Sequence, residues 1–104
     1  MYCFTIRYPR HDSTFFDMTY YKDKHIELVK NRFSLYGLKT VVVKEGVSLN
    51  SATNKTLYAA TDLIFEDVEG FQSAIAKNGK EVGADIINYT DSKPLFEYSE
   101  LEYT

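Results

Sequence analysis

Apolar and polar residues alternate at both ends of this chain, as they do in a β-strand with one buried face. At the N-terminal end the apolar positions are Tyr2, Phe4, Ile6 and Tyr8, and the pattern stops at Pro9. Residues 93–103 alternate in the same way, while residues 38–47 and 57–66 are rich in β-branched and other apolar residues. The sequence therefore predicts four strands, over residues 2–8, 38–47, 57–66 and 93–103.

The spacing of apolar residues between the first two strands is that of an amphipathic helix. This helix is predicted over residues 18–33, with Asp17 as its N-cap and Phe16 packing against its first turns. Gly37 marks its end, because glycine readily adopts the left-handed conformation that terminates helices.

A second helix is predicted after Asp67, which is placed to cap it. Gly79 is expected to break or kink this helix, with a short further helix over residues 80–87. The polar residues 48–56 show no periodicity and predict a loop, the most mobile segment of the chain.

The predicted order is strand, helix, strand, strand, helix, strand, in a single domain over residues 1–104. This order indicates an α+β, ferredoxin-like βαββαβ fold with a four-stranded antiparallel sheet. Two helices cover only one face of such a sheet, although several strands carry apolar groups on both faces. We therefore expect a homodimer in which the uncovered sheet faces pack together.

Composition argues against several classes of partner and site. The net charge of -3, with no run of basic residues, argues against nucleic acid as a partner. No apolar stretch is long enough for a membrane span or a signal peptide, so we expect a cytoplasmic protein without membrane contact. Cys3 is the one cysteine, and no histidine pair has metal-ligand spacing, so neither a disulfide nor a metal site is predicted.

His25 lies in the middle of the apolar stripe of the first helix, where an unpaired polar group costs roughly 1 to 3 kcal/mol. Either it is a general acid or base facing a cavity, or it is a core histidine with an internal partner. Tyr21 lies one turn earlier, where it either holds the imidazole or polarises a ligand oxygen, or simply fills the core. Asp85 or Asp91 either orients His25, with Asp85 counted in the catalytic set, or serves a local structural role.

Three further residues are candidates for ligand binding. Arg32 shares the stripe with His25, where it either binds an anionic group or covers apolar surface with its stem. Tyr89 and Asp91 belong to a polar cluster before the last strand, whose members also suit turns and caps.

Three segments together resemble the EthD family, which is named for ethyl tert-butyl ether degradation. They are FDMTYYKDKHIELV (residues 16–29), YGLK (residues 36–39) and GADIINYTDSKPLFEYSE (residues 83–100). The resemblance implies a dimeric α+β barrel and favours a functional role for His25, on which the first motif is centred. It also implies either an oxidoreductase or a cofactor-independent acid/base enzyme of the lyase type.

The resulting hypothesis is an enzyme that acts on a hydrophobic or aromatic, oxygen-bearing small molecule in a pocket between sheet and helices. The alternative is a non-catalytic protein of a degradation pathway that binds or delivers such a compound. No cofactor is predicted, because the chain has no glycine-rich nucleotide motif, and flavin or haem binding stays open as a third alternative.

Overall fold

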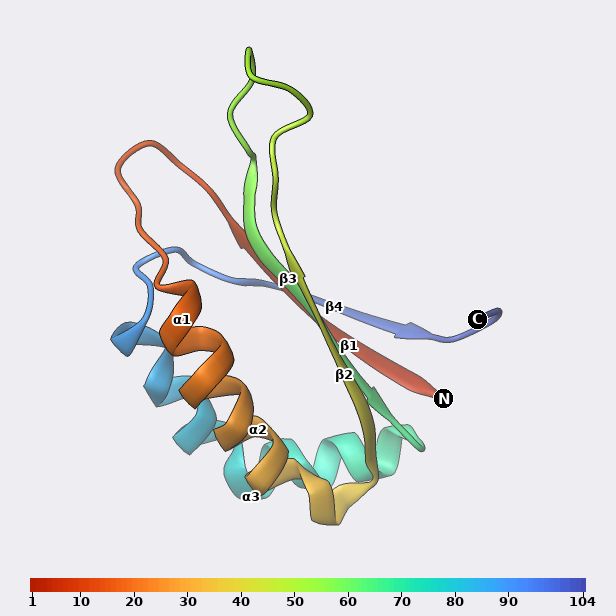
Figure 1. Cartoon of the computed structure of the whole chain (residues 1–104). Helices are drawn as coiled ribbons and strands as arrows, with labels where there is room; N and C mark the ends of the chain where they lie inside the picture. Colours follow the sequence, from red (N-terminus) through yellow and green to blue (C-terminus); the bar gives the residue numbers. More distant parts are fainter.

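The computed structural model describes residues 1–104 and consists of a four-stranded sheet with helices on one face (Figure 1). The strands are β1 (Tyr2–Pro9), β2 (Leu38–Glu45), β3 (Leu57–Phe65) and β4 (Leu95–Glu100). The helical segments are α1 (Met18–Tyr20), η1 (Tyr21–His25), α2 (Ile26–Phe33), η2 (Ser34–Tyr36), α3 (Val68–Ala84) and η3 (Asp85–Asn88). None of these helices is long and apolar enough to cross a membrane.

The sheet has the strand order β2-β3-β1-β4, and all neighbouring strands are antiparallel. In the register, Phe4 of β1 lies opposite Leu63 of β3 and Tyr98 of β4. The predicted ferredoxin-like α+β fold is therefore confirmed. The last strand is shorter than predicted, since β4 covers Leu95–Glu100 rather than residues 93–103.

The first helix is not the uniform α-helix that the sequence predicts. Asp17 caps it as expected, its side chain accepting a hydrogen bond from the Tyr20 N–H at 3.0 Å. The segment η1 is a π-helical turn, in which the N–H of Ile26 donates to the carbonyl of Tyr21, five residues earlier. Such turns insert one extra residue and rotate everything that follows. Gly37 ends the helical run in the left-handed conformation, with φ 86°.

The second helix is longer than expected, because α3 continues as one helix through Gly79. Asp67 caps it by accepting a hydrogen bond from the Gly70 N–H at 2.9 Å. A glycine in a helix interior costs only about 1 kcal/mol relative to alanine, and packing against the sheet outweighs that cost here. Of the two alternatives at Gly79, the break is therefore wrong, whereas Figure 1 shows α3 changing direction along its length, as a kink would cause. The short η3 turn follows α3 directly.

The core between sheet and helices consists of two clusters. One is rich in phenylalanine and includes Phe4, Val29, Phe33, Leu63, Phe65, Phe71 and Ala74. The other is rich in tyrosine and includes Tyr8, Tyr21, Ile26, Tyr58, Ala59 and Tyr89. The predicted loop joins β2 to β3 and projects beyond the sheet (Figure 1).

Candidate functional site

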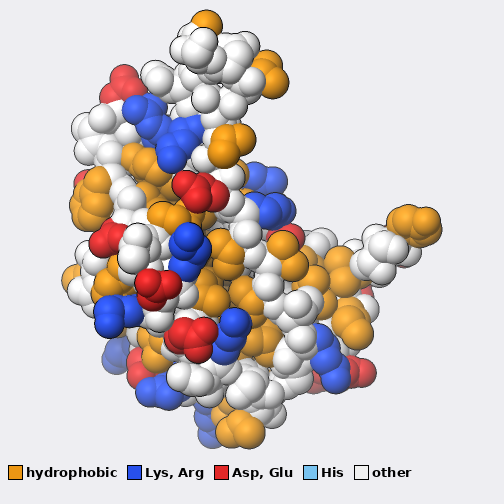
Figure 2. Space-filling view, viewed as in Figure 1, with side chains coloured by type: hydrophobic (Ala, Val, Ile, Leu, Met, Phe, Trp, Pro, Cys, Tyr) orange, Lys and Arg blue, Asp and Glu red, His pale blue; other side chains and the backbone are white.

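A cavity of about 410 Å³ lies between the sheet and the helices. This volume is within the range of small-molecule sites, and 14 of the 19 lining residues are hydrophobic. Its walls come from β1, β3 and β4 on the sheet side and from η1, α2 and α3 on the helix side. In Figure 2, hydrophobic side chains are visible between the charged side chains in the middle of the view.

His25 forms part of the cavity wall and is only 5% exposed. Its Nδ1 lies 2.9 Å from Oδ2 of Asp85. Its other ring nitrogen, Nε2, makes no hydrogen bond, yet every fully buried side-chain nitrogen and oxygen in the protein has a partner. Nε2 is therefore not fully buried, and His25 is one of the residues that line the cavity.

Asp85 holds the imidazole from the end of α3. Its other oxygen, Oδ1, accepts hydrogen bonds from the Tyr20 hydroxyl at 2.7 Å and from the Asn88 amide at 2.9 Å. Burial raises the pKa of Asp85, but the hydrogen bonds from Asn88, Tyr20 and His25 outweigh it and leave the pKa below its usual value. The carboxylate is therefore ionised at neutral pH, and it is positioned on both oxygens.

The protonation state of His25 follows from this geometry. Burial lowers the pKa of His25, and the interaction with Asp85 offsets that effect only in part. The ring is therefore neutral at pH 7, and its one proton sits on Nδ1, because the ionised Asp85 can only accept. This arrangement leaves Nε2 with an unprotonated lone pair and no hydrogen-bond partner, in a residue that lines the cavity. That is the state that a general base requires.

The effect of Asp85 on this histidine gives a direct prediction. In an Asp85→Asn variant the pKa of His25 should fall further, because the favourable charge is lost while the burial remains. An NMR pH titration of the imidazole resonances checks this, with those of His11, in the exposed loop before α1, as internal reference. A His25 pKa that is unchanged or higher in the variant would contradict the assigned pairing.

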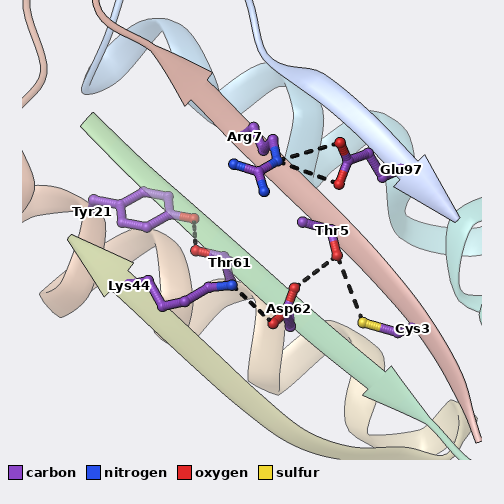
Figure 3. Close-up of polar contacts among 8 residues, drawn as sticks. All are labelled: Cys3, Thr5, Arg7, Tyr21, Lys44, Thr61, Asp62 and Glu97. Carbon is purple, nitrogen blue, oxygen red and sulfur yellow. Dashed lines mark hydrogen bonds and ion pairs between the residues drawn. The ribbon is translucent and has the colours of Figure 1, made fainter. Parts of the chain in front are cut away.

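The rings of Tyr21 and Tyr89 lie beside the imidazole, with centroids 5.5 and 4.6 Å from that of His25. The Tyr21 hydroxyl lies 2.6 Å from Oγ1 of Thr61 on β3 (Figure 3), and the hydroxyls of Tyr8 and Tyr89 are also 2.6 Å apart. Burial raises the pKa of Tyr8 to about 12 and raises the pKa of Tyr21 and Tyr89 as well. All three phenols therefore stay protonated, so they act as hydrogen-bonding groups rather than as bases.

Tyr21 thus lies beside His25 without bonding to it. The two rings stack with their centroids 5.5 Å apart and an angle of 16° between their planes. The role of holding the imidazole, one alternative for Tyr21, belongs instead to Asp85. Tyr21 still lines the cavity, as do Tyr8 and Thr61, two residues that the sequence did not single out.

The predicted ligand-binding residues do not line this cavity. Arg32 is exposed and makes a two-pronged ion pair with Glu81 of α3, at 2.8 and 3.0 Å. Asp91 is exposed and accepts a hydrogen bond from the Phe15 N–H at 3.0 Å. Tyr89 is fully buried behind the cavity wall, where it supports Tyr8. A uniform helix would place Arg32 on the inner face, whereas the π-turn rotates the residues after His25.

No group of three or more His, Cys, Asp and Glu side chains is arranged to hold a metal ion. Cys3 is buried on β1, on the sheet face opposite the cavity, with its sulfur 3.6 Å from Oγ1 of Thr5. It fills space there, as its position in the first strand predicts.

Several solved structures share the fold of this protein over nearly the whole chain. An EthD-like protein from Ralstonia eutropha JMP134 is 29% identical, with a TM-score of 0.87 over 99% of this chain and 95% of that one. An ethyl tert-butyl ether (EthD) family protein from Bacillus halodurans C-125 is 18% identical, with a TM-score of 0.73 over 97% and 98%.

A dimeric ferredoxin-like protein from an uncultured marine organism is 13% identical, with a TM-score of 0.64 over 100% of this chain and 97% of that one. The last two similarities concern the fold alone. No family model and no curated protein matches the sequence.

Proposed function

Because this chain has the fold of the EthD family, we propose that it is a small-molecule enzyme in which His25 is the general base. One observation supports this above the others: a neutral imidazole in the wall of an apolar cavity, with Nδ1 held by Asp85 and Nε2 free. A carboxylate that fixes the tautomer and stabilises the imidazolium is how proteins activate histidine.

The proposed reaction is proton transfer next to a carbonyl group of a hydrophobic compound. Nε2 of His25 removes a proton from the carbon beside the carbonyl, and the electron pair moves onto the carbonyl oxygen. Tyr21, whose hydroxyl is protonated, is placed in the cavity wall to stabilise that oxygen by a hydrogen bond. The imidazolium then returns the proton to carbon or to oxygen, so the step balances without a co-reactant. The groups at the cavity thus favour acid/base chemistry over the oxidoreductase alternative.

A non-catalytic binding protein is the second candidate. The hydrophobic character of 14 of the 19 lining residues supports it, since such a cavity binds apolar compounds by burial alone. In that case His25 would only orient the ligand, and no bond would break.

Hydrogen–deuterium exchange separates these two functions. The probe is 2-tetralone, an aromatic ketone with an acidic α-hydrogen, incubated with the protein in D₂O and followed by proton NMR. Exchange of that hydrogen requires only a base and a stabilised enolate. The enzyme proposal expects exchange well above that in buffer alone, whereas binding without exchange would favour the second candidate.

We also propose that the chain forms a homodimer through the sheet face that no helix covers. On this face Lys44 and Arg7 lie in one row, both opposite Ala60 in the strand register. Asp62 and Glu97 form the next row, both opposite Thr5. Figure 3 shows that each basic residue also contacts an acidic one within the chain, Lys44 with Asp62 at 3.3 Å and Arg7 with Glu97 at 3.3 Å.

This charge pattern is complementary to itself. A two-fold axis that crosses the strands between the two rows would place the basic row of one copy over the acidic row of the other. Val42, which is 41% exposed, and Leu95, which is 57% exposed, would be covered in the same contact. The fold thus offers a face that a second copy fits by charge as well as by apolar area.

Light scattering coupled to size-exclusion chromatography tests the dimer. Wild type should elute with the mass of two chains, and Val42→Arg should elute as a monomer, because a bulky charge would sit between the sheets. Val47→Arg is the matched control, since Val47 is 79% exposed and follows the end of β2. A monomeric wild type, or a dimeric Val42→Arg, would refute this interface.

A further inference from the structure

The cavity wall contains one side chain with a permanent positive charge. Of the 19 lining residues, 14 are hydrophobic, and the others are His25, Thr61, Gly79, Lys80 and Gly83. His25 is neutral at pH 7, and no aspartate or glutamate belongs to the lining. Lys80 is therefore the one charged side chain in the cavity lining that a bound ligand can contact at pH 7.

Lys80 has no acidic partner within the protein, since none of the ion pairs includes it. The adjacent Glu81 forms an ion pair with Arg32 at 2.8 Å. Asp85, at the start of η3, is hydrogen-bonded to His25, Tyr20 and Asn88. The positive charge at the cavity is thus left uncompensated by the residues closest to it in the chain.

The position of Lys80 is that of a residue at the cavity mouth, because it is exposed to solvent and also lines the cavity. An ammonium group there can contact water and ligand together, so an anionic group reaches it without full desolvation. Behind it the cavity is apolar. A molecule that matches both parts has a hydrophobic body and an anionic end.

We propose that the ligand of this cavity is an amphipathic carboxylate, with its carboxylate bound by Lys80 and its hydrophobic body inside. This inference rests on the proposed function of the cavity and names the chemical class of its substrate. Lys80 is exposed at the mouth, whereas His25 is only 5% exposed in the cavity wall. The carboxylate and the carbon that His25 deprotonates should therefore lie at different ends of the molecule.

The test compares two probes of the same shape, 2-naphthoate and its neutral amide, 2-naphthamide. Their affinities for the full-length protein are measured by isothermal titration calorimetry at pH 7 and low salt. Wild type should bind the carboxylate about tenfold more tightly than the amide, as expected for a charge-assisted hydrogen bond at a partly exposed site.

Three variants assign that preference to Lys80. Lys80→Gln should bind both probes alike, and Lys80→Arg should keep much of the preference for the carboxylate. Lys77→Gln removes a charge from the exposed surface of the same helix, outside the cavity lining, and should behave as wild type. The charge-removing variants change exposed residues, so circular dichroism should show an intact fold in both.

The outcomes separate this inference from the enzyme proposal. Equal affinity of wild type for both probes, or an equal loss in Lys80→Gln and Lys77→Gln, would overturn the carboxylate inference. Exchange of 2-tetralone by wild type would still support the catalytic role of His25 in that case. Conversely, a carboxylate preference that depends on Lys80 would stand even if no exchange were found.

Discussion

Replacing His25 with glutamine should slow the protein-dependent exchange of 2-tetralone by about two orders of magnitude or more, the usual contribution of a positioned general base. Glutamine has a similar length and can still hydrogen-bond to Asp85, but it cannot accept a proton at neutral pH. Because a change of rotamer lets the glutamine amide donate to Asp85 in place of Nδ1, the fold should persist while the chemistry is lost.

The pH dependence gives a second, independent signature. Only the neutral imidazole acts as a base, so the wild-type rate should rise as the pH rises through the pKa of His25 and then level off. Burial places that pKa below 6.5, so the plateau should already be reached at neutral pH. His11→Gln is the matched control, because His11 is exposed in the loop before α1 and should leave the profile unchanged. An unchanged rate in His25→Gln would refute the role of His25 as a base.

The architecture could be predicted because its signals are local. Strand alternation and the caps at Asp17 and Asp67 depend on neighbouring residues, and both predicted caps make their hydrogen bonds in the structure. The π-turn and the continuity of α3 through Gly79 depend instead on what the helices pack against. A helical pattern that assumes 3.6 residues per turn does not detect an inserted residue, so it misplaces Arg32, although Val29 and Phe33 are buried as the pattern predicts.

The residues of the site also differ in whether a local sequence pattern predicts them. His25 stood out because a polar residue in an apolar stripe needs an explanation, and Asp85 was a plausible partner by its chemistry. Tyr8 carried only the signal of lying on the same strand face as Phe4 and Ile6. Its hydroxyl meets that of Tyr89, 81 residues later, and no local pattern reports such a contact. Thr61 was missed for the same reason, since its partner Tyr21 lies 40 residues away.

The second large effect concerns Phe33, where the phenylalanine core forms part of the cavity wall. Phe33 is 1% exposed, belongs to that core and also lines the cavity. Phe33→Ala should lower the free energy of unfolding by about 3–5 kcal/mol, because it removes a buried ring and leaves a void. Collapse around the site is hindered, since the rings of Phe33 and Phe65 already lie 6.1 Å apart in a packed sheet–helix interface.

Urea unfolding followed by far-UV circular dichroism measures this loss, with Leu35→Ala as the matched control. Leu35 lies two residues later and is 88% exposed, so its truncation should change the free energy of unfolding by less than about 0.5 kcal/mol. A typical domain has only about 5–15 kcal/mol to lose, so the Phe33 variant should unfold at clearly lower urea concentration. If the two variants were equally stable, the space beside Phe33 would have to close freely. The cavity wall would then be too soft to hold a ligand against His25 in one orientation, which the proposed proton transfer requires.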